Sequence, residues 1–538
     1  MSATDSIPEG VFNMPVPRAL AYMAASVLIG LGAGLGQGLV SANVAQLAGD
    51  LGVTTAQASW LLVAFVLPRA AMPLMLIKIR TQFGLRRFAE VAIVCYVLVD
   101  FAALWIDDLR SAVVVELLSG GASAALSTLA FMYILEPLNP QWRMRLGLPV
   151  ALAFLTMGPS LARVVSPALI GDGGLVRLHL MALGLAMVSL AQVFLLPLGP
   201  VPHMKVIRPL DLLSFALIAF GFGGLITGAV MGPIYWWQEV SWIGALLAAA
   251  VASLTLAVVI ELRRAEPLID IRWLVSPAML HLSATLLIFR IILSEQSTGA
   301  PRMFLALGLS PGQMAPLFAL ICLATLAGGI ACIGWIRPGR EPQFHLVALL
   351  LIAAGTWMDC HATIETRPEQ MYLSQAMIAF AGMLFMPPAM MAGLLQAFRK
   401  GPQYILSFII VYISTQSIGG ILGSGAFTTL INMRQAFHYH TLQEELLATH
   451  APYTAELARQ VLRLAPQIGD SAQLRAQALV QIATEASNQA YVLAYNDAYF
   501  LTFLLAVFAA CALCLHLFRD WLMAQIAARR TILPETAS

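Results

Sequence analysis

About fourteen long apolar runs, each near the length that a bilayer-spanning helix needs, follow one another along this 538-residue chain. Only short polar breaks separate most of them. Charged residues make up 11% of the chain, against roughly 25% in an ordinary soluble domain. That is too few to cover a water-facing surface. The sequence therefore predicts an all-α polytopic membrane protein.

The positions of Lys and Arg predict the orientation of these spans. The predicted spans are 19–44, 57–77, 88–106, 111–135, 147–169, 177–198, 210–231, 240–261, 276–295, 312–335, 344–361, 371–396, 403–430 and 498–521. With the N-terminus inside, 19 of the 30 basic residues fall in cytoplasmic segments and 8 on the opposite side. Basic residues in short loops favour the cytoplasmic side. Both termini are therefore expected to be cytoplasmic.

Three arginines lie inside otherwise apolar spans: Arg69, Arg163 and Arg290. A charge at this depth costs roughly 2.5 kcal/mol or more, so each is expected to face a cavity or a partner. A cavity with three guanidinium groups favours an anionic organic ligand. Pairing with intramembrane acids or backbone carbonyls is the alternative. Further deep polar groups complete the predicted substrate-binding set: Gln37, Asn43 and Gln416.

Proton-driven transport needs a buried acid that can bind and release a proton. The intramembrane acids are few. Asp100 and Glu116 are the deepest and are the predicted proton-coupling residues, whereas Glu295 and Asp359 lie near the outer ends of their spans. A static ion pair with a neighbouring arginine is the alternative for both deep acids.

The segment 432–496 is long and polar, and it falls on the extracytoplasmic side. Within it, 471–493 is predicted to form an amphipathic helix, because Asp470 or Ser471 can cap its start. A second short helix is expected at 455–464. The segment is either a solvated cap over the mouth of the protein or a docking surface for a partner.

Small residues recur at helical spacing in two spans, as Gly30, Gly34 and Gly38 and as Gly419, Gly420 and Gly423. Such stripes let helix backbones approach closely in lipid. Gly158 and Pro159 form a further pair that can bend a helix. The sequence therefore predicts tight helix packing with a hinge at Gly158 and Pro159.

Four stretches together resemble the fourteen-helix drug:proton antiporter branch of the major facilitator superfamily, EmrB/QacA type. They are VSANVAQLAGDLGV from Val40, Gly158-Pro159, GGILGSGAFTTLINMRQAF from Gly419, and NQAYVLAYNDAYF from Asn488. The resemblance covers nearly the whole chain. It implies two six-helix halves with two inserted helices between them.

The domains expected from this resemblance are 1–18 (a cytoplasmic segment), 19–200 (the N-terminal half), 201–270 (the inserted helices), 271–521 (the C-terminal half) and 522–538 (a cytoplasmic tail). The resemblance also implies a gating loop at Gly84, Arg86 and Arg87. Several family positions differ here: Thr81 and Gly36 stand where an Asp is usual, and Glu116 stands where an Arg is usual.

The resemblance implies a secondary transporter in a bacterial inner membrane that exports amphiphilic compounds, including anionic aromatic compounds and drugs, by proton antiport. A periplasmic adaptor protein and an outer-membrane channel are the implied partners. The alternatives are an organic-anion importer or exchanger and a non-transporting sensor or scaffold. Neither a GxxxxGK[ST] loop nor an HExxH pattern is present, and Cys511 and Cys514, although spaced as CxxC, lie one helical turn apart in an apolar run and are read as small apolar residues. No enzyme activity, cofactor, metal or nucleic-acid partner is therefore expected.

Overall fold

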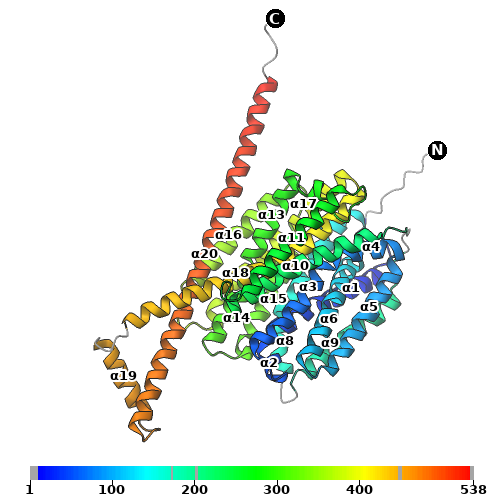
Figure 1. Ribbon diagram of the computed structural model, residues 1–538. Helices are drawn as coiled ribbons and strands as arrows, with labels where there is room; N and C mark the ends of the chain where they lie inside the picture. The colour runs from blue at the N-terminus through cyan, green and yellow to red at the C-terminus, as the bar shows by residue number, and fades with distance from the viewer. Residues whose placement is uncertain (1–9, 171–173, 200–203, 446–450, 533–538) are drawn as a thin grey trace, which may run out of the picture.

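The computed structural model describes residues 10–170, 174–199, 204–445 and 451–532, which form a helical bundle (Figure 1). The longer helices of the first half are α1 (Val16–Ala42), α3 (Thr55–Ala71), α4 (Pro73–Phe83), α5 (Leu85–Ala102), α6 (Leu109–Leu135), α8 (Leu148–Leu169) and α9 (Val176–Leu195). Next come α10 (Pro209–Tyr235) and α11 (Ser241–Arg263). The remainder holds α13 (Pro277–Ile292), α14 (Ser294–Ala306), α15 (Pro311–Trp335), α16 (Glu341–Asp359), α17 (Tyr372–Lys400), α18 (Pro402–Glu445), α19 (Ala451–Leu464) and α20 (Ser471–Ile532).

Short elements connect these helices: α2 (Val44–Asp50), α7 (Pro140–Trp142), a π-helical turn at Arg143–Gly147, and α12 (Ile271–Leu274). Among the described residues, 12 helical segments are long and apolar enough to cross a membrane, or up to 13 if the bent pair α2 and α3 counts as one. The all-α, multi-pass membrane fold predicted from the sequence is confirmed.

Two of the fourteen predicted spans are missing from this set of 12. Span 57–77 is split at Met72 into α3 and α4, because Pro73 has no backbone N–H to donate to the helix, although Met72 itself keeps helical φ and ψ of −56° and −35°. Span 344–361 falls on the 19-residue helix α16, whose first turns carry Glu341, Gln343 and His345. Both regions are helical, but neither α3, α4 nor α16 alone has the length and mean hydropathy of a span.

Glycines bring α1 and α8 into backbone contact. A Cβ built on Gly34 would lie 2.8 Å from the main-chain oxygen of Leu155, and one on Gly158 would lie 2.2 Å from the carbonyl carbon of Gly34. Only glycine fits at such a distance. The structure therefore uses Gly158 for close packing, and α8 is helical without interruption through Pro159.

The predicted inserted pair corresponds to α10 and α11. Helix α10 packs against α3 of the first half and α18 of the second, as well as against α11. Helix α11 contacts α10 mainly, and its outer side chains, such as Val251 and Leu256, are exposed. Thus α10 bridges the two halves, while α11 lies at the periphery.

The polar segment 432–496 is mostly helical rather than a loop. Helix α18 continues past the predicted span end to Glu445, α19 follows, and α20 begins at Ser471 and is unbroken through the last predicted span. The two short helices predicted here are confirmed as α19 and the first part of α20. In Figure 1 these elements extend beyond one end of the bundle, while the last part of α20 extends past the other.

Candidate substrate cavity

A cavity of about 590 Å³ lies between the two halves of the bundle. Its walls come from α1, α3, α6 and α8 of the first half, from α10, and from α13, α14, α15, α17 and α18 of the second. All six predicted substrate-binding residues line it: Gln37, Asn43, Arg69, Arg163, Arg290 and Gln416. The structure thus brings residues from five helices and one connection to a single space.

The arginines in this wall are held by neutral groups. Arg163 donates to the main-chain oxygens of Pro159 at 3.4 Å and Ser297 at 3.2 Å, and its guanidinium carbon lies 5.2 Å from the centre of the Phe318 ring. Arg69 lies 5.8 Å from the centre of the Phe65 ring, and its Nη1 atom is buried with no hydrogen-bond partner.

Arg290 of α13 packs against the predicted glycine stripe of α18. Its Nε donates to the main-chain oxygen of Gln416 at 3.2 Å. A Cβ on Gly420 would lie 2.9 Å from Arg290 Nη2, and one on Gly423 would lie 2.5 Å from Ser294 Oγ. These glycines therefore make room for a guanidinium group as well as for a helix backbone.

The sequence analysis missed a fourth cavity arginine, Arg302, which donates to Thr428 Oγ1 at 2.8 Å. Among the described residues, no Asp or Glu lines the cavity, and none of these four arginines forms an ion pair. The wall therefore presents an excess of positive charge. The alternative of static pairing with Asp100 or Glu116 does not apply in this conformation, whereas the alternative of bonding to backbone carbonyls holds for Arg163 and Arg290.

The other polar groups of the wall are differently placed. Asn43 is buried and donates to Leu39 O at 2.8 Å and Ser166 Oγ at 2.9 Å. Gln37 and Gln416 are half-buried. Apolar lining includes Met383, Met386 and Phe318. An apolar wall with a few polar anchors is typical of a small-molecule site.

Several exposed residues of the cavity lining lie at one end of the bundle. Exposed Thr55, Arg302 and Leu305 belong to its lining, where α1 ends and α3 begins, the side predicted to be extracytoplasmic. At the opposite end, Arg145 of the π-helical turn donates to Ile333 O at 3.2 Å and Gly334 O at 3.4 Å at the end of α15. These bonds join the two halves at the end of the bundle opposite the exposed lining residues.

The predicted proton-coupling residues lie away from this cavity. Asp100, near the end of α5, is 8% exposed, and its Oδ2 has no partner. Glu116 in α6 lines a separate cavity of about 150 Å³ with Asp107 and His179. Of the predicted hinge, Pro159 lines the central cavity.

Within the part of the chain that the structure describes, the predicted gating loop makes no ion pair to another element. Gly84, with φ of 85°, joins α4 to α5. Arg86 pairs with Glu90 one turn along the same helix at 2.8 Å, and Arg87 is exposed. Ion pairs and hydrogen bonds to other elements come instead from Lys78 and Gln82 of α4, the helix that precedes this loop.

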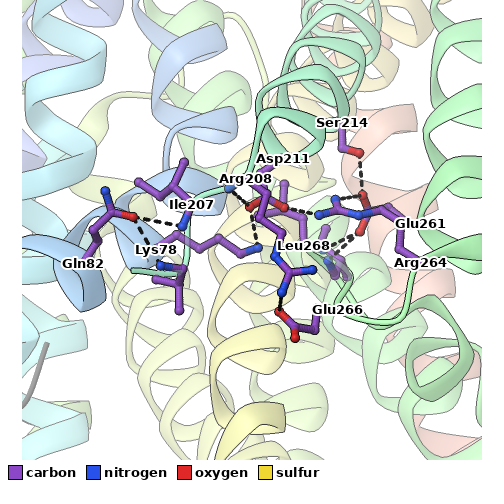
Figure 2. A network of polar contacts seen from close by, with 12 residues as sticks. Lys78, Gln82, Ile207, Arg208, Asp211, Ser214, Glu261, Arg264, Glu266 and Leu268 are labelled. Atoms are coloured by element: carbon purple, nitrogen blue, oxygen red, sulfur yellow. Dashed lines mark hydrogen bonds and ion pairs between the residues drawn. The ribbon is translucent and has the colours of Figure 1, made fainter. Parts of the chain in front are cut away.

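Figure 2 shows these contacts, here named the inner network: Lys78, Gln82, Asp211, Ser214, Glu261 and Arg264. Lys78 Nζ of α4 lies 2.8 Å from Asp211 Oδ2 of α10. Arg264, just after α11, pairs with Asp211 and, at 2.7 Å, with Glu261. The network therefore ties the inserted pair α10 and α11 to the first half.

Backbone groups complete the inner network. Glu261 accepts from Ser214 Oγ and from the N–H of Leu268, and Gln82 accepts from the N–H of Ile207 at 2.9 Å. Burial lowers the pKa of Arg264, but its hydrogen bonds to Asp211 and Glu261 outweigh this and hold the pKa above its ordinary value. Each buried charge here has an opposite partner.

Comparisons with known proteins define the fold. The human organic anion transporter MFSD10 (TETRAN) superposes with a TM-score of 0.54 at 14% identity over 92% of this chain and 100% of its own. A bacterial homologue of the human drug peptide transporters PepT1 and PepT2 gives 0.55 at 14% identity, over 94% and 99%. The proton:xylose symporter XylE of the major facilitator superfamily gives 0.51 at 13% identity, over 91% and 95%.

No family model matches the sequence, and no curated relative matches it either. At these identities the solved structures show the fold alone. The chain therefore has the major facilitator fold, as the sequence analysis predicted.

Proposed function

We propose that this protein is a secondary active transporter that exports amphiphilic organic anions, aromatic carboxylates in particular, by proton antiport and alternating access. The observation that carries the proposal is the cavity wall with four arginines and no lining acid. Positive charge in a low-dielectric hollow between two halves attracts an anion strongly. Its apolar and thioether surface suits the rest of an amphiphilic molecule.

The two ends of the bundle support alternating access. Exposed residues of the cavity lining lie at the end predicted to face the periplasm, and Arg145 joins the two halves at the other end. Rocking of one half against the other would exchange these states around a fixed midplane site. The superposed transporters include one described as an organic anion transporter and one described as a proton symporter.

The decisive experiment measures uptake of radiolabelled 2-naphthoate into liposomes that contain the purified full-length protein. A pH gradient, acid inside, is imposed and then collapsed with a protonophore. We expect uptake that depends on the gradient, and weaker uptake of the lipophilic cation ethidium. Uptake of ethidium in preference to 2-naphthoate, or uptake of 2-naphthoate that survives the protonophore, would contradict the proposal.

The location that goes with this function is a bacterial inner membrane with both termini cytoplasmic. We propose that the helical extension formed by the end of α18, α19 and the start of α20 contacts a periplasmic adaptor, which leads to an outer-membrane channel. Helices α19 and α20 pack on each other around buried Ala478 and Ile482, leaving Leu462 74% and Val480 65% exposed. Leu462→Glu and Val480→Glu should abolish adaptor cross-linking and leave uptake into liposomes unchanged.

A further inference from the structure

Two buried carboxyl groups, Glu295 and Asp359, lie on either side of one side-chain amide in the second half of the bundle. Glu295 is in the first turn of α14, Asp359 ends α16, and Gln375 belongs to α17. Their exposed fractions are 1%, 3% and 0%. Gln375 Nε2 donates to Glu295 Oε1 at 3.0 Å and to Asp359 Oδ2 at 2.8 Å. A single nitrogen therefore holds both carboxyl groups close together.

No cation balances this pair. Among the described residues neither acid forms an ion pair, and Asp359 accepts further only from Ser374 Oγ. Titratable groups near the pair include Tyr495 and Tyr499 of α20, Arg302 of α14, and Cys360 and His361 after α16; the same elements also carry His345 of α16, Tyr372 of α17 and Asp497 of α20. Arg302 donates to Thr428, and His361 bonds the carbonyl of Trp357.

Two neighbouring carboxylates in an apolar interior, held only by neutral donors, repel each other and have lost most of their hydration. One proton bound by the pair removes the repulsion and neutralises one of the two buried charges. Such a pair takes up and releases protons as a unit. The arrangement is therefore suited to holding one proton more than the two separate acids would hold in water.

Two buried polar atoms without a hydrogen-bond partner also indicate that a proton binds here. Glu295 Oε2 and Tyr499 Oη are buried without a hydrogen-bond partner. A Cβ built on Gly299 would lie 3.0 Å from Tyr499 Oη and 3.2 Å from Glu295 Oε1. The hydroxyl and the carboxyl thus share the space that this glycine leaves, and Tyr499 is fully buried there.

The pair lies directly behind the wall of the substrate cavity. Gln296, next to Glu295 in sequence, lines the cavity, and its Nε2 donates to the main-chain oxygen of Gln375 at 3.0 Å. Arg290 belongs to the same membrane-spanning segment, Pro277–Ala306. A movement of α14 that accompanies filling of the cavity would therefore change the distance between Glu295 and Gln375.

We propose that Glu295 and Asp359, bridged by Gln375, form the proton-binding site of this chain, in place of Asp100 and Glu116. One carboxylate takes up a proton in the outward-open arrangement and loses it when α14 moves. Only the coupling half of this inference rests on the proposed transport function; the binding of a proton by the pair does not.

Infrared spectroscopy of the full-length protein in lipid bilayers tests proton binding without any substrate. A protonated buried carboxyl group gives a carbonyl-stretching band that a carboxylate lacks. We expect such a band in the unmodified protein, and we expect Glu295→Gln and Asp359→Asn each to remove or shift it. Asp100→Asn is the control and should leave that band in place. A band that disappears only with Asp100→Asn, or no band at all, overturns the proposal.

The coupling half is tested by transport of 2-naphthoate in liposomes. Glu295→Gln and Asp359→Asn should keep exchange of labelled for unlabelled probe within about twofold and lose gradient-driven accumulation by about tenfold or more, because exchange needs no proton step. Accumulation equal to that of the unmodified protein overturns the coupling role. If the unmodified protein neither exchanges nor accumulates the probe while the band behaves as stated, the proposed transport fails and the proton site stands.

Discussion

The inner network and the substrate cavity both contain buried positive charges, but only those of the network are paired with acidic side chains. In the network, Lys78 and Arg264 face Asp211 and Glu261, so the buried charges balance. In the cavity, four arginines face hydroxyl groups, carbonyl oxygens and aromatic rings, with no acid in the described lining. The ion pairs of the network hold helices together, whereas the cavity arginines have no acidic partner in the described lining and are free to attract an anionic ligand.

This difference separates stability from function. Removing one member of a balanced buried cluster leaves an uncompensated charge, which is strongly destabilising. Removing a cation that has no counter-charge should cost little stability, because its desolvation penalty disappears with it. The following experiments test this contrast.

The largest effect on stability is expected for Asp211→Ala. This change leaves Lys78 and Arg264 buried without their shared partner, and the cost is about 3–5 kcal/mol. Thermal unfolding of the purified protein, followed by loss of the monodisperse fraction, measures it. Lys78→Met combined with Asp211→Asn should cost less than the sum of the single changes. Strict additivity would show that the pair is not coupled.

The cavity should respond in the opposite way. Arg69→Met and Arg290→Met are each expected to lower uptake of 2-naphthoate by about tenfold or more, equivalent to about 1.4 kcal/mol of binding. The unfolding midpoint should stay the same or rise, because Arg69 Nη1 is buried without a partner. Arg86→Met, which removes an exposed charge at the inner end, is the matched control. A large loss of stability in Arg69→Met would mean that its charge is compensated after all.

A smaller effect is expected at Arg145, whose hydrogen bonds to the end of α15 join the two halves. Arg145→Ala removes two hydrogen bonds to the end of α15, worth about 1 kcal/mol together, and so favours the inward-open state about fivefold. The neighbouring thiol of Cys332 is fully buried in the closed state. In a variant with Cys332 as the only cysteine, the rate of maleimide labelling should rise by a similar factor. An unchanged rate would place the inner closure elsewhere.

The contrast also shows what the sequence could reveal. The cost of placing a polar group in lipid was enough to select six residues that prove to line one cavity, although their role in binding is still a prediction. Arg302 was missed because it follows the predicted span end at 295, and a charge outside the bilayer carries little cost. The pairing of Lys78 with Asp211 joins residues far apart in the chain, and no local pattern marks it. The helix over span 403–430 continues to Glu445, beyond the predicted span end, because polarity marks where a chain leaves the bilayer and does not mark where a helix ends.

The smallest effect is expected at the exposed edge of the inner network, where Arg208 pairs with Glu266. Their side chains are 55% and 67% exposed. Water screens such a pair and its ordering costs side-chain entropy, so Glu266→Gln should change the free energy of unfolding by less than about 0.5 kcal/mol. The Arg208–Glu266 pair lies beside the Arg264–Asp211 pair in sequence, and the two ion pairs differ mainly in burial. A loss approaching that of Asp211→Ala would mean that net charge at this end, and not compensation of buried charge, stabilises the contact between the first half and the inserted helices.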